Sequence, residues 1–125
     1  MITSKQITAT SVSVPEKVYT SSTTGAAIGG GVTGQNSAIT TMILCNIGAP
    51  TISDESINSV NVNVYLVKSG DTAGTDNLIV SNLTVPAGET VFFSDEKIIL
   101  DSGDEVWIGT SAASLITATI STLPV

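Results

Sequence analysis

The densest group of side chains that could do chemistry is a set of carboxylates near the end of the chain: Asp95, Glu96, Asp101, Asp104 and Glu105. Paired carboxylates can hydrolyse glycosides, and clustered carboxylate oxygens can bind calcium. All five lie in or beside predicted turns, where Asp normally accepts hydrogen bonds from nearby backbone. We therefore expect solvated turn residues, with a calcium site as the alternative, although the spacing matches no EF-hand.

Other catalytic and metal-binding groups are sparse. The chain has no histidine, which excludes Ser-His and Cys-His nucleophile pairs and most zinc, copper and iron sites. Residues 29–34 are glycine-rich but lack the lysine of a phosphate-binding loop. The single cysteine, Cys45, excludes an internal disulfide, and its apolar neighbours predict a small buried core residue. We predict no enzymatic activity and no cofactor.

Charge and hydropathy narrow the range of partners. The 125 residues carry four lysines, no arginine and 11 acidic residues, for a net charge of −7, which disfavours nucleic acid and anionic membranes. No apolar run approaches the roughly 20 residues of a membrane span, and the N-terminus lacks the features of a signal peptide. We expect synthesis in a cytoplasm. Only 12% of residues are charged, which suits a surface packed against copies or partners.

The elements that must position any site are β-strands. In residues 60–67, Val60, Val62, Val64 and Leu66 share one face, as in a strand with one side in a core. Further strands are expected at residues 16–20, 37–46, 78–85, 90–93, 98–100, 105–110 and 115–122, with an N-terminal edge strand or arm within residues 1–14 and one helical turn at most, at 51–59. The short, regular spacing predicts one domain, 1–125, folded as an antiparallel β-sandwich or jelly roll of about eight strands.

Three side chains on the opposite strand faces are candidate contacts. Tyr65 and Val67 share the second face of the strand at 60–67, and Trp107 lies between Val106 and Ile108. If those two aliphatic residues face the core, Trp107 faces outward and could contact a subunit or a sugar ring. The alternative is that both sheet faces are covered there and Trp107 belongs to the core.

Residues 21–36 predict a long, flexible, uncharged loop with five glycines. One interpretation is an arm that lies on a neighbouring subunit, with Ile28 and Val32 as its apolar contacts. The other is a mobile hairpin tip.

Four stretches, residues 39–46, 60–67, 83–90 and 99–106, give the chain a family resemblance. An apolar strand ending in Cys-Asn, the alternating strand, Leu-Thr-Val-Pro-Ala-Gly-Glu-Thr and Leu-Asp-Ser-Gly-Asp-Glu-Val together resemble small virion structural proteins of tailed bacteriophages. The likeness runs from about Tyr19 to the C-terminus. Family members usually have a short turn where this chain has residues 21–36.

The resemblance implies a β-sandwich without enzymatic activity, present in many copies on a phage particle. We expect a capsid decoration or cement protein that forms a homo-oligomer, such as a trimer, and contacts the major capsid protein or other virion proteins. A tail or baseplate component is the second hypothesis. A carbohydrate-binding module using Trp107 and Tyr65 is the third.

Overall fold

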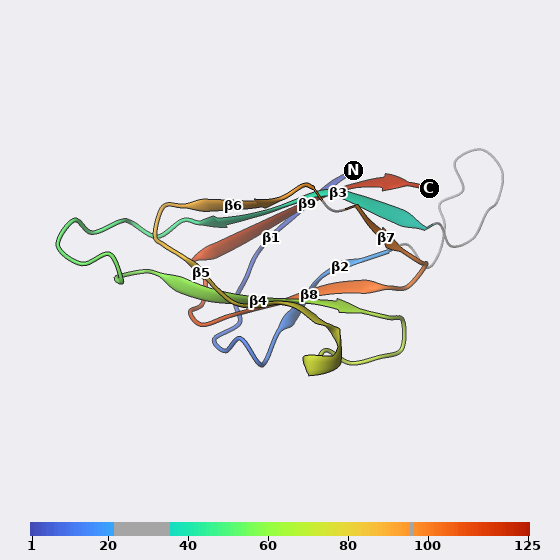
Figure 1. Cartoon of the computed structure of the whole chain (residues 1–125), viewed down its shortest axis with the longest axis horizontal. Helices are drawn as coiled ribbons and strands as arrows, with labels where there is room; N and C mark the ends of the chain where they lie inside the picture. The colour runs from blue at the N-terminus through green and yellow to red at the C-terminus, as the bar shows by residue number, and fades with distance from the viewer. Residues whose placement is uncertain (22–35, 96) are drawn as a thin grey trace.

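The computed structural model describes residues 1–21, 36–95 and 97–125. The regular secondary structure of this part of the chain consists of β-strands and one short 3-10 helix (Figure 1). Residues 22–35, with Ile28 and Val32, and Glu96 lie outside the described residues. The strands are β1 (Ile2–Gln6), β2 (Glu16–Thr20), β3 (Ser37–Asn46), β4 (Val60–Val67), β5 (Leu78–Val85), β6 (Thr90–Phe93), β7 (Ile98–Leu100), β8 (Glu105–Thr110) and β9 (Ile116–Pro124).

The strands form two antiparallel sheets that pack face to face (Figure 1). One has the order β1-β9-β3-β6, with β7 pairing the same edge of β3 as β6 does, and the other has the order β2-β8-β4-β5. The pairs nest: β1 with β9, β2 with β8, β3 with β6 and β7, and β4 with β5. A long hairpin rolled up in this way is a jelly roll, so the predicted fold class is confirmed.

Strand β4 supplies the centre of the core, as its alternation predicts. Val60, Val62 and Val64 are fully buried. They pack in one apolar cluster with residues of the opposite sheet, among them Met42, Leu44, Ile116, Ala118 and Ile120. Fully burying one such valine or isoleucine stabilises the fold by about 1.5–3 kcal/mol, so this cluster holds the two sheets together.

Strand β3 departs from simple alternation because it contains a bulge. Its register with β9 shifts between Ile39 and Thr41, and a one-residue shift moves the following side chains to the other face. Ile39 and Met42 therefore both lie in the core, whereas Cys45 is half-buried on the outer side. The prediction that Cys45 is a buried core residue is therefore wrong.

The first strand is shorter than expected. It ends at Gln6, and residues 7–15 cross from one sheet to the other instead of continuing as an edge strand. Glu16 holds this crossing: it accepts hydrogen bonds from the backbone N–H groups of Thr8 and Ala9 and forms a 2.9 Å ion pair with Lys5. Burial raises the pKa of Glu16, but the bonds from Lys5 and the two N–H groups outweigh it, so the net pKa is lowered.

The crossing segment lies against the outer face of the β2-β8-β4-β5 sheet. The Tyr65 hydroxyl donates a 2.8 Å hydrogen bond to the Val12 carbonyl. A Cβ atom at Gly109 would come within 2.3 Å of that same oxygen. Glycine at 109 is therefore what lets the segment approach the sheet closely.

Two connections differ from the sequence expectation. Residues 51–59 form turns and no helix, because Asp54 Oδ1 accepts hydrogen bonds from the Ser56 N–H (2.9 Å) and hydroxyl (2.6 Å), which fixes a turn and lowers the pKa of Asp54. The 3-10 helix lies instead in the connection between β4 and β5, at Thr75–Asn77, where the Gly74 N–H donates to Asn77 Oδ1 at 2.9 Å.

We predict that Gly109→Ala destabilises the protein by roughly 2–3 kcal/mol, because the new methyl group meets backbone atoms that can move only with the whole crossing segment. Gly74→Ala is the matched control, since Gly74 is extended, with φ −170°, and has open space around its Cβ position. Urea unfolding measures both. Equal midpoints for the two variants would contradict the close approach at Gly109.

We predict that Glu16→Gln destabilises the protein by about 1–2 kcal/mol at pH 7, because charge-assisted hydrogen bonds to two N–H groups and Lys5 are weakened. The folded-state pKa of Glu16 lies below its ordinary value of 4.5. Its stabilisation is therefore fully present above that value and is lost as pH falls through the lower folded pKa. Urea unfolding from pH 7 to pH 2.5 should show the wild type and variant converging at the acidic end. A gap independent of pH would refute this role, and Glu55→Gln controls for removing one charge.

Candidate interaction face

Among the described residues, the outer face of the β1-β9-β3-β6 sheet has no charged side chain. Residues directly opposite each other on paired strands point to the same side, which defines this face from the register. We call it the outer sheet face; its members are Ile2, Ser4, Gln6, Ala38, Thr40, Thr41, Ile43, Cys45, Thr90, Phe92, Ile99, Thr117, Thr119, Ser121 and Leu123. In Figure 1 no described element lies over it.

Several hydroxyl groups on the outer sheet face already have hydrogen-bond partners within it. Ser4 Oγ and Thr119 Oγ1 are 2.9 Å apart across β1 and β9. Thr40 Oγ1 donates within 3.1 Å to the carbonyl or hydroxyl oxygen of Ser121 across β3 and β9. Burying a polar group costs much less free energy when its hydrogen bond is already made. Removing water from this part of the face therefore costs little free energy.

The large apolar side chains on the outer strands and at the end of β9 are exposed, whereas Ile43 and Cys45 on β3 are half-buried. Phe92 has 62% of its surface exposed and stands opposite Ile43 on β3. Ile99 and Leu123 are each 56% exposed, on strands that flank Ala38 from the two sides. A partner could cover a sheet face of this composition without burying an unpaired charge.

The predicted contact residues lie on the other sheet, and the structure gives them different surroundings. Val106 and Ile108 are fully buried in the core, so Trp107 faces outward as expected; it is half-buried, and its Nε1 donates a 3.2 Å hydrogen bond to Glu105. Tyr65 and Val67 also point away from the main core but are only 4% and 1% exposed.

The outward face of this second sheet is therefore partly occupied by the chain itself. The crossing segment covers the Tyr65 hydroxyl, and Lys17 forms a 3.1 Å ion pair with Glu105 beside Trp107. Tyr65 and Trp107 do not form an open aromatic platform, because only the second ring has appreciable exposure. An interface role for Tyr65, Val67 and Trp107 stays a prediction, as it does for Ile28 and Val32 outside the described residues.

Among the acidic turn residues, Asp104 accepts hydrogen bonds from the backbone, whereas Glu105 accepts them from side chains. The Asp104 carboxylate accepts from the Ser69 N–H and from the Asp101 N–H, both at 3.0 Å, and so ties two turns together. Within residues 1–21, 36–95 and 97–125, no group of three or more His, Cys, Asp and Glu side chains could hold a metal ion.

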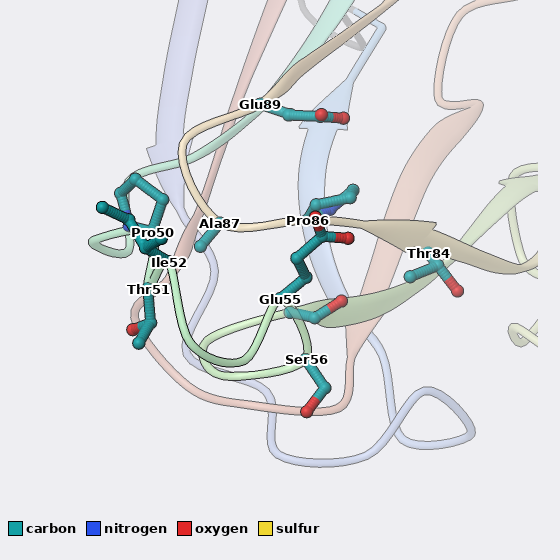
Figure 2. A pocket seen from close by; sticks show the side chains of 10 residues that line it. Pro50, Thr51, Ile52, Glu55, Ser56, Thr84, Pro86, Ala87 and Glu89 are labelled. Atoms are coloured by element: carbon teal, nitrogen blue, oxygen red, sulfur yellow. The ribbon is translucent and has the colours of Figure 1, made fainter.

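A hollow of about 720 Å³ lies between the 47–59 connection and the β5–β6 turn (Figure 2). Pro50, Pro86 and Ala87 give it apolar walls, and Glu55 and Glu89 bring two carboxylates to it (Figure 2). Both glutamates are exposed to water, and neither has a basic neighbour among the lining residues. The hollow thus brings carboxylate and hydroxyl groups together with no basic side chain among the residues that line it.

A second, smaller hollow opens between the two sheets along β5, β6 and β7. It has a volume of about 360 Å³ and an apolar lining that includes Leu66, Ile79, Phe93 and Ile98. On this side β5 belongs to one sheet and β6 and β7 belong to the other, so no strand pairing connects them. Side chains alone close the sandwich here.

The outer sheet face itself is absent from the sequence predictions, although one signal for it exists. Residues 116–122 alternate Ile, Ala, Ile and Thr inward with Thr, Thr and Ser outward, which indicates a strand with a hydroxyl-rich outer side. The structure places this strand beside β1 and β3, whose outward residues are also uncharged. These pairings join distant segments of the chain, so the local pattern does not predict them.

Comparison with known proteins adds no relative: no protein-family model matches the chain, and no curated protein matches it. Among the described residues, no helix is long and apolar enough to cross a membrane.

Proposed function

We propose that this protein is a non-enzymatic structural component of a phage virion, most specifically a capsid decoration or cement protein. The observation that carries the proposal is the outer sheet face, which exposes Phe92, Ile99 and Leu123, has no charge among the described residues, and could join copies of the protein into the oligomer that contacts the capsid. The sequence resemblance to small virion proteins supports the same role, and a jelly-roll domain is a fold used in capsids.

The proposed mechanism is adhesion between surfaces. A contact of standard size buries about 1,600 Å² in total, and many copies on one particle add their individual contacts. The net charge of −7 discourages the free protein from binding nucleic acid during assembly, because phosphate groups repel it. No side chain needs an unusual pKa for this role.

We predict that particles of the source phage lacking this protein still assemble but lose heat tolerance, since the protein adds contacts to a completed shell. The measurement is the fraction of intact heads after a temperature ramp, with and without added purified protein. Restored tolerance after addition is the expected result. Heads with unchanged tolerance would refute the cement role.

Cryo-electron microscopy of the particle separates the proposed location from its rival. Density for this domain on the head surface supports the decoration role. Density only on the tail or baseplate would overturn that role in favour of a tail component.

A further inference from the structure

We propose that a second copy of this chain covers the outer sheet face, so that two molecules pack back to back about a twofold axis. This inference rests on the proposed structural role and names the first partner in it. It assigns the homo-oligomer contact to β1, β9, β3, β6 and β7, and it leaves the rest of the surface for the particle.

The charge distribution favours a second copy over a charged partner. Two molecules that each carry −7 repel one another, so they can approach closely only through a surface that holds none of that charge. Every described charged side chain lies outside the outer sheet face. Glu89, Asp95 and Lys97 flank it, in the turns at the two ends of β6. An uncharged centre with a charged border is the usual anatomy of a protein interface.

Removing water from the outer sheet face costs little free energy, and this holds for both copies in the dimer. The Ser4–Thr119 and Thr40–Ser121 hydrogen bonds satisfy four of the hydroxyls on the outer sheet face. In a twofold interface the same patch of each molecule contacts its counterpart, so the low free-energy cost of desolvation applies to both molecules. Exposed Phe92 and Leu123 then supply apolar contact area from each molecule.

The size of the outer sheet face fits a stable dimer. Strands β1, β9 and β3 have five, nine and ten residues, and β6 and β7 fill the fourth position with four and three. At about 3.4 Å per residue and about 4.8 Å per strand, the flat area is roughly 500 Å². The relief of the side chains raises the accessible area toward the about 800 Å² per partner of a standard interface. Two such sheets pack face to face at about 10 Å.

Sedimentation equilibrium of the purified chain over a range of concentrations tests the inference. We expect a particle of twice the 12.7 kDa chain mass. Phe92→Glu and Leu123→Glu should each weaken this dimer by about 30-fold or more, because every copy brings a buried charge to the contact. Ile79→Glu is the matched control: Ile79 is 48% exposed on β5 of the other sheet, and its replacement should leave the dimer unchanged.

Cys45 provides an independent readout, since it is half-buried on the outer sheet face. Its reaction with a thiol reagent should slow as protein concentration rises, and should not slow in Phe92→Glu. Circular dichroism and thermal melting confirm that the variants are folded. A monomer at all concentrations, a trimer, or a dimer that both face variants leave intact would overturn the inference.

Two outcomes separate this inference from the proposed function. Wild-type protein that is monomeric in solution and still restores heat tolerance to heads would overturn the dimer and keep the cement role. A dimer that depends on Phe92 but never binds heads would keep the dimer and overturn the cement role.

Discussion

Both sheets of this protein depend on its last two strands. β9 lies between β1 and β3, and β8 lies between β2 and β4. Without them, β1 and β2 would have no strand neighbour, and the core residues of β4 would lose Ile108, Ile116 and Ile120. These pairings join the two ends of the chain, as in the contact of Ile2 with Ser121. The fold is therefore completed only when the C-terminal strands enter, which is typical of slow-folding β-topologies.

The two outer faces of the sandwich differ because the chain covers only one of them among the described residues. Residues 7–15 cross onto the β2-β8-β4-β5 sheet, where the Tyr65 hydroxyl and the space above Gly109 receive them. Glu16 fixes the start of that crossing. The opposite face has no such segment, and its exposed Phe92, Ile99 and Leu123 remain in contact with water.

This asymmetry supports the proposed role in assembly. Charge and the acidic turns occupy the ends and the covered side of the sandwich, where Asp104 and Glu105 make hydrogen bonds or ion pairs. Among the described residues, the uncharged side presents several hydroxyls that are already hydrogen-bonded, together with exposed apolar side chains.

The class of fold and nearly every strand could be predicted from the sequence, because alternation in residues such as Val60, Val62 and Val64 reports directly which side of a strand is buried. Alternation cannot report bulges or the pairing of distant segments. A bulge between Ile39 and Thr41 turned Cys45 outward, and the crossing segment buried Tyr65 on a face that looked open. The uncharged outer sheet face also arises only from pairing, because its members come from five strands spread from residue 2 to residue 123. Local pattern fixes the direction of each side chain, whereas neighbouring strands decide what that side chain meets.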